Sequence, residues 1–147
     1  IQAFSKAIEL YPSYSDAYGQ RGLAYYRLNQ MEAALADYKK AVQFNPGNAN
    51  ALSNMGSLYF QQKEYQNAKI AFERAIKVNP NHVDALANYA STLGTLGDYN
   101  SAITYFKKAV NLKPTEANYY QMIGVSYQNL GNQNMANQYF QKAQSLK

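Results

Sequence analysis

The chain has 147 residues, a formal net charge of +5 and no cysteine. The absence of cysteine excludes disulfides, thiol nucleophiles and cysteine-ligated zinc, and it leaves cytoplasm and periplasm equally compatible. No apolar run approaches the roughly 20 residues that a membrane-spanning helix needs, and the net positive charge alone would suit an acidic protein, a nucleic acid or a membrane surface.

Proline sets the organisation of the chain, because its four prolines are spaced 34 residues apart. A fixed period of this length predicts a stacked repeat array in which each unit contacts mainly its neighbours. We expect a single array over 1–147, divided into a partial repeat at 1–14, repeats at 15–48, 49–82 and 83–116, and a C-terminal capping repeat at 117–147. The prolines are Pro12, Pro46, Pro80 and Pro114.

The first stretch, Ile1 to Leu10, reads as the second helix of a partial repeat. Its partner helix is missing, so we expect the array to continue upstream in the parent protein. In each complete repeat, apolar residues recur at three- and four-residue steps in two runs, the period of amphipathic helices. First helices are predicted at about 14–28, 48–62, 82–96 and 116–130, and second helices at about 31–44, 65–78, 99–112 and 133–146.

Helix ends follow from residue type. The residue after each proline is expected to be an N-cap, because serine, threonine, asparagine and glycine favour that position; these residues are Ser13, Gly47, Asn81 and Thr115. Asp98 and Asn132 are expected to cap the last two second helices. First helices are expected to end at residues with a left-handed backbone conformation, at Asn29, Lys63, Gly97 and Gly131. Glycine and asparagine adopt this conformation readily, whereas lysine does so less well.

The last repeat carries polar residues on the face that would meet a fifth copy, at Gln133, Asn137 and Gln144. A polar outer face is what a terminal cap requires, so we expect the array to end near Lys147.

The repeats agree at several places, counted from Ser15, Ala49, Val83 and Ala117. Place eight is small (Gly22, Gly56, Ala90, Gly124), place twenty is alanine throughout (Ala34, Ala68, Ala102, Ala136), and place twenty-four is aromatic (Tyr38, Phe72, Phe106, Phe140). In these places the chain resembles a tetratricopeptide repeat (TPR) protein. The resemblance implies an all-α, right-handed superhelical solenoid of antiparallel helix pairs. It also implies a non-catalytic module that binds a peptide or extended protein segment in a concave groove, within a larger scaffold or adaptor.

No residues suggest catalysis, a cofactor, a metal or a small-molecule substrate. The chain lacks a glycine-rich phosphate loop and a His-x-x-x-His spacing, and His82 is its only histidine. A lone histidine without histidine or cysteine partners is not expected to bind metal. Asp16 and Asp84 lie near helix starts, where a carboxylate stabilises the helix dipole.

The resemblance implies that first helices line the concave surface. The sixth place of the repeat, on the first helix, is an amide in three repeats, at Gln20, Asn54 and Asn88. A carboxamide donates and accepts, so it can pair with the backbone of an extended peptide. The peptide-holding superhelix of the O-GlcNAc transferases has asparagine at this place, which Asn54 and Asn88 match.

At place twelve, Tyr26 and Phe60 are expected either to grip a partner side chain or to pack between first helices, and Gly94 leaves space for a bulky ligand residue. The remaining groove candidates are Arg27, Asn50, Gln61 and Asp84. Arg21 takes an apolar place, where we expect its stem to pack and its head to reach solvent. Some TPR domains have a clamp of lysine, arginine and asparagine side chains that binds two carboxylates of a partner. This type of site is disfavoured here, because the cations of the clamp are missing and Arg27 alone cannot replace them.

Other functions remain open. One is self-assembly through the uncapped N-terminal helix or the convex face, where Lys40, Arg74 and Lys108 form a basic stripe whose simpler interpretation is a solvated, dipole-matched helix end. Another is substrate recruitment for an attached enzyme. Nucleic-acid binding is disfavoured, because related 35-residue RNA-reading repeats lack this proline and alanine pattern.

Overall fold

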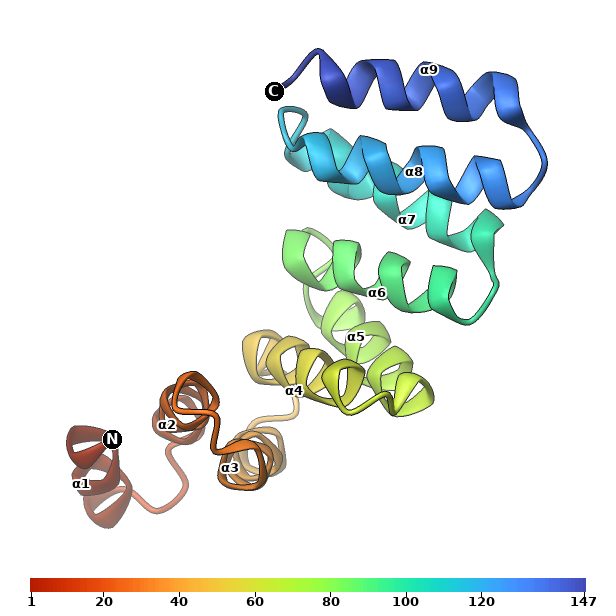
Figure 1. Cartoon of the computed structure of the whole chain (residues 1–147). Helices are drawn as coiled ribbons and strands as arrows, with labels where there is room; N and C mark the ends of the chain where they lie inside the picture. The colour runs from red at the N-terminus through yellow and green to blue at the C-terminus, as the bar shows by residue number, and fades with distance from the viewer. The chain divides into compact units, whose positions relative to one another are not determined.

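The computed structural model describes residues 1–147, which form nine α-helices and no strand (Figure 1). They group into two compact units, Ile1–Asn79 and Pro80–Lys147. Within each unit, consecutive helices pack as pairs. The prediction of an all-α protein built from antiparallel helix pairs is confirmed.

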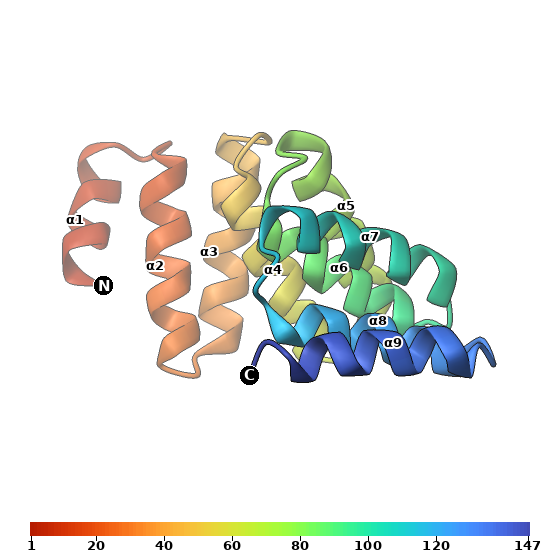
Figure 2. The ribbon, with the colours of Figure 1, turned by 90° about the horizontal axis from the view of Figure 1, so that it is seen from above.

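The first unit contains α1 and two helix pairs. The helices are α1 (Gln2–Leu10), α2 (Ser15–Arg27), α3 (Met31–Phe44), α4 (Ala49–Gln61) and α5 (Tyr65–Val78). Seen from above, α1, α2 and α3 lie side by side, and α2 and α3 run in opposite directions (Figure 2). The first helices α2 and α4 also contact each other directly.

The second unit repeats this arrangement with two helix pairs. Its helices are α6 (Val83–Thr95), α7 (Tyr99–Leu112), α8 (Ala117–Asn129) and α9 (Gln133–Gln144). The first helices α6 and α8 contact each other, and α7 packs on both α6 and α8. The predicted helix bounds differ from the observed ones by one residue at the ends of the first helices and by two at the end of α9.

Each pair is held by an aromatic ring of the second helix seated against the small residue of the first. A Cβ added at Gly22 would lie 2.9 Å from the ring of Tyr38, and one added at Gly56 would lie 2.8 Å from the ring of Phe72. Both rings are fully buried, and the alanines at place twenty are 0% exposed. The small residue sets how closely the two helices approach, as side chains at a contact do in general.

The first helices end as predicted. Their terminal residues have left-handed backbones, with φ of 59° at Asn29, 61° at Lys63, 85° at Gly97 and 75° at Gly131. A backbone N–H beyond each turn reaches the carbonyl five residues back, as from Gln30 to Tyr25 at 2.9 Å. This is the hydrogen bond of a Schellman motif, which satisfies the last carbonyls of the helix.

The predicted N-caps of the first helices are wrong by one residue: Ser13, Gly47, Asn81 and Thr115 are replaced by Tyr14, Asn48, His82 and Glu116. Proline and the residue after it form a turn instead. Tyr14 N–H donates to the Tyr11 carbonyl at 3.0 Å, which places Pro12 at the second position of that turn. Of the observed caps, the side chains of Asn48 and His82 accept the N–H groups of Ala51 and Ala85. The caps predicted for α7 and α9, Asp98 and Asn132, are confirmed.

The expectation that the head of Arg21 reaches solvent is also wrong. Its guanidinium donates to both carboxylate oxygens of Asp37 on α3, at 2.7 and 2.8 Å, and to the hydroxyl of Ser5 at 3.1 Å. Asp37 raises the pKa of Arg21, chiefly through this hydrogen bond. Arg21 and Asp37 occupy places seven and twenty-three, which face each other across the helix pair. In the third repeat Tyr89 and Tyr105 hold those places, with ring centroids 4.7 Å apart.

Candidate functional site

The predicted groove residues of the first unit lie on α2 and α4, the two first helices that contact each other. Gln20, Arg27, Asn50 and Gln61 are exposed, whereas Asn54 is half-buried. Gln61 of α4 donates through its amide to the hydroxyl of Tyr26 on α2. The thirteenth place of one repeat therefore adjoins the twelfth place of the repeat before it, and the two helices share one polar surface.

Phe60 is positioned differently from Tyr26, although both hold place twelve. Its ring packs edge-on against Tyr65 of α5, with centroids 5.3 Å apart and an interplanar angle of 63°. Phe60 is thus fixed by the second helix of its own repeat, and Tyr26 by the first helix of the following one. The two aromatic residues do not form a common ring pair.

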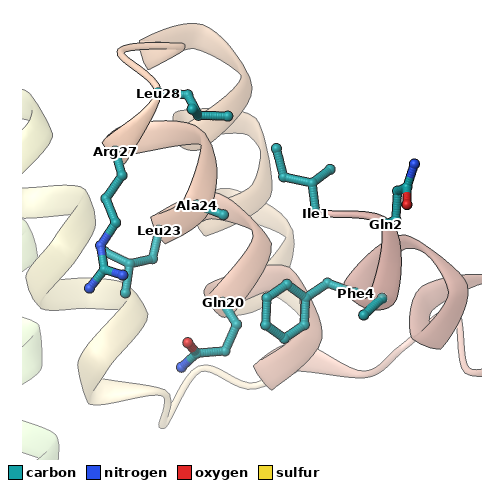
Figure 3. A pocket seen from close by; sticks show the side chains of 9 residues that line it. Ile1, Gln2, Phe4, Gln20, Leu23, Ala24, Arg27 and Leu28 are labelled. Carbon is teal, nitrogen blue, oxygen red and sulfur yellow. The ribbon is translucent and has the colours of Figure 1, made fainter.

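A separate hollow of about 680 Å³ lies between α1 and α2. Phe4 points from α1 toward α2 near Gln20, and Ile1 faces Leu28, whereas Arg27 extends away from α1 (Figure 3). Of the predicted groove residues, Gln20 and Arg27 line this hollow. Phe4 holds the aromatic place that Tyr38 and Phe72 hold in the next two repeats, where a glycine of the same repeat covers the ring.

In the second unit, the predicted residues Asp84 and Asn88 lie on α6. Asp84 is exposed in the first turn of this helix, and Asn88 is half-buried one turn further on. Burial first, and then the carboxylates of Asp84 and Glu116, raise the pKa of the nearby Tyr119 phenol. Asp84 of α6 and Glu116, the N-cap residue of α8, therefore both lie near Tyr119. Asn88, one turn after Asp84, carries an amide that can both donate and accept.

A smaller, open pocket of about 230 Å³ is lined by residues of α6, α7 and α8, including Gly94. The sequence indicated space at Gly94, but it did not reveal the floor, which Tyr99 and Phe106 of α7 provide. A comparison of places twelve and seventeen between repeats was the available signal. Phe60 and Tyr65 hold these places in the second repeat, and Gly94 and Tyr99 hold them in the third.

The residues predicted to form a basic stripe lie on the second helices α3, α5 and α7. Lys40, Arg74 and Lys108 are all exposed, and the Lys108 ammonium lies 4.6 Å from the ring centroid of Tyr105. The structure has no cluster of three or more histidine, aspartate or glutamate side chains arranged to hold a metal ion. None of its helices is long and apolar enough to cross a membrane.

Antiparallel helix pairs that repeat with small, alanine and aromatic residues at fixed places define a helical-hairpin repeat protein. Models of the tetratricopeptide repeat match residues 3–36, 47–115 and 117–147, and a model of the TPR repeat matches residues 22–63. The chain belongs to the tetratricopeptide repeat family. Proteins of this family bind protein partners and are generally non-catalytic, so the chain is a protein-interaction module of the scaffold type.

Solved structures of MamA are similar to this chain. One crystal structure of MamA has a TM-score of 0.91 at 28% identity, covering 99% of this chain and 85% of that one. A second has a TM-score of 0.89 at 28% identity, covering 99% and 79%. MamA from residue 41 to its end, from Desulfovibrio magneticus RS-1, shares the fold, with a TM-score of 0.88 at 20% identity over 99% and 82%. No curated protein sequence matches the chain.

Proposed function

We propose that the chain binds an extended segment of a protein partner on its first helices, through carboxamides that pair with the partner's backbone. In the first unit, the residues concerned are the groove candidates on α2 and α4, which we call the amide face: Gln20, Asn50, Asn54 and Gln61. Asn88 on α6 is the corresponding amide of the second unit. An extended peptide presents N–H and C=O groups in alternation, and a carboxamide can satisfy either. The partner's sequence would then matter less than its extended backbone.

The observation that carries this proposal is the hydrogen bond from Gln61 to Tyr26. It joins neighbouring first helices through polar side chains at adjoining places, so that the amides of α2 and α4 occur on one surface. Asn54 is half-buried on this surface, so part of its carboxamide remains accessible to a partner.

The test is capture of partners from a lysate by the intact chain and by the variant Asn54→Ala with Asn88→Ala, read by mass spectrometry. A matched control carries Gln66→Ala with Asn111→Ala, which removes two exposed amides from the second helices α5 and α7. We expect at least one protein to be retained by the unmodified chain and the control and lost by the Asn54/Asn88 variant. Identical retention by all three proteins would refute the amide face.

A second candidate is self-assembly, and the hollow between α1 and α2 is the observation that favours it. Apolar side chains remain accessible there, since Ile1 is 39% exposed and Leu28 is 60% exposed. In this second proposal, the hollow receives a helix of another copy of the chain. Light scattering should then show a mass that rises with concentration for the unmodified chain and stays monomeric for Leu28→Asp. A mass that does not change with concentration would remove this candidate.

A further inference from the structure

The pocket of about 230 Å³ in the second unit is built at a place where the repeat pattern loses a ring. In the second repeat, Phe60 at place twelve packs edge-on against Tyr65 at place seventeen, with centroids 5.3 Å apart. In the third repeat the corresponding residues are Gly94 and Tyr99, and both line the pocket. In the second repeat, the ring of Phe60 therefore fills the position beside Tyr65. In the third repeat, the corresponding position beside Tyr99 has no ring.

Apolar side chains from three helices line much of the pocket. Phe106 of α7 is 2% exposed and Ala90 of α6 is fully buried, and Met122 and Val125 of α8 also line it. A Cβ added at Gly94 would lie 3.8 Å from the Cβ of Ala102, an ordinary contact, so the space at Gly94 is not closed by neighbouring atoms. These surfaces suit an apolar side chain, whose burial removes them from water.

Four polar side chains around the pocket are already hydrogen-bonded within their own helices. The hydroxyls of Ser91 and Thr95 donate to carbonyls one turn back at 3.0 Å each, and the hydroxyl of Ser126 does so at 2.9 Å. The amide of Asn129 donates to the Val125 carbonyl at 2.8 Å. An apolar group can therefore enter without leaving a buried donor unpaired, which would cost binding free energy.

We propose that this pocket binds a phenylalanine-like aromatic side chain of the partner, edge-on to Tyr99, as Phe60 packs on Tyr65. The volume lies below the roughly 300–1,000 Å³ of pockets that hold drug-sized molecules, which fits one side chain rather than a free metabolite. Aromatic anchors in well-packed pockets commonly dominate protein–protein affinity. The pocket rests on the proposed function and deepens it, because it adds a side-chain anchor to a partner whose backbone Asn88, on the same helix α6, would contact.

The experiment follows the methyl resonances of Met122 and Val125 by NMR in the intact chain during titration with N-acetyl-phenylalaninamide. N-acetyl-alaninamide is the control ligand. We expect saturable shifts with the phenylalanine derivative and none with the alanine derivative. Gly94→Phe should abolish the shifts, since its ring would occupy the space as Phe60 does in the second repeat. Thr104→Phe, which adds the same ring at an exposed place on α7, should leave them intact.

A second variant keeps the test decisive if Gly94→Phe loses helicity. Met122→Gln places a polar group in the pocket wall at a half-buried position, and it should weaken the shifts at Val125. Absence of shifts in the unmodified chain, or equal shifts in Gly94→Phe, would overturn the proposal. Asn54→Ala with Asn88→Ala should retain the shifts, so that a failure of the amide face and a failure of the pocket are distinguishable.

Discussion

Replacing Gly56 with alanine should destabilise the chain, whereas the same replacement at Gly94 should stabilise it. Both glycines lie in first helices, at Ala49–Gln61 and Val83–Thr95, and neither has a left-handed backbone. Alanine is favoured over glycine in a helix interior by about 1 kcal/mol, so helix propensity alone predicts a gain at both positions. The difference arises from what the new methyl group meets.

At Gly56 the added Cβ would lie 2.8 Å from Cδ1 and Cε1 of Phe72 and 3.0 Å from its Cζ. Carbon atoms normally approach to about 3.5–4.0 Å, so the ring or the helix must shift. Phe72 is 0% exposed, and a side chain in a close-packed interior has little room to shift. Overpacking of this kind costs roughly 1–3 kcal/mol, against which propensity returns about 1 kcal/mol.

The third repeat suggests an overpacking cost near the middle of this range of about 1–3 kcal/mol. There, alanine (Ala90) holds the place of Gly56, phenylalanine (Phe106) holds the place of Phe72, and both side chains are buried. A helix pair of this design can therefore accommodate the methyl group when its other contacts are adjusted to it. For Gly56→Ala we expect a net loss of about 1 kcal/mol. For Gly94→Ala, whose Cβ would make only a 3.8 Å contact, we expect a gain of about 0.5–1 kcal/mol.

The assay is urea unfolding of the unmodified chain and the two variants, followed by circular dichroism, with the midpoints compared at equal slope. Opposite signs at the two positions would support control of the helix–helix distance by the small residue at place eight. Gly56→Ala at or above the stability of the unmodified chain would refute this reasoning. Destabilisation by Gly94→Ala would refute the openness of the pocket wall.

Three further predictions concern single side chains. Asp37→Ala should cost roughly 3 kcal/mol, because it leaves the guanidinium of Arg21 partly buried without its partner; thermal unfolding should show most of that loss recovered when Arg21→Met is added. Burial raises the pKa of Tyr38 to about 12, above its unfolded value of about 10. The neutral phenol therefore contributes fully to the free energy of unfolding below about pH 10, and this contribution is lost as pH rises through about 12. Measured against pH, the stability of Tyr38→Phe should fall less over this range than that of the unmodified chain. Lys63→Gly should raise the free energy of unfolding by about 0.5–1 kcal/mol, since φ is 61° there and the two later repeats have glycine. The urea midpoint should therefore rise, and an unchanged midpoint would contradict this.

Much of the fold could be predicted from the sequence because the period and the helix ends are local signals. Four prolines at one spacing define the repeats, and the residues with positive φ at the ends of the first helices include two glycines and an asparagine. The N-caps were wrong because the turn at proline uses the next residue, so Ser13 is part of the turn and the cap falls at Tyr14. A preference for residue type cannot distinguish these neighbouring positions.

The contacts between helices were harder to predict. The ion pair of Arg21 with Asp37 joins residues 16 apart, and it follows only once places seven and twenty-three are known to face each other. The bond between Gln61 and Tyr26 likewise depends on how one repeat adjoins the next. For the candidate site, the amide places remain a prediction from the sequence. The sequence also indicated space at Gly94, whereas the contribution of Tyr99 and Phe106 to that pocket depends on the position of α7.

Site-specific photocrosslinking tests most directly whether partners bind on the first helices. A benzophenone amino acid would be placed at Gln20 on α2 and at Gln121 on α8, and in control proteins at Arg74 on α5 and Lys108 on α7, all exposed positions. After illumination with the captured partner, we predict crosslinks from Gln20 or Gln121 and none from the two second-helix positions. Crosslinks confined to Arg74 and Lys108 would contradict binding on the first helices and assign the partner to the second helices.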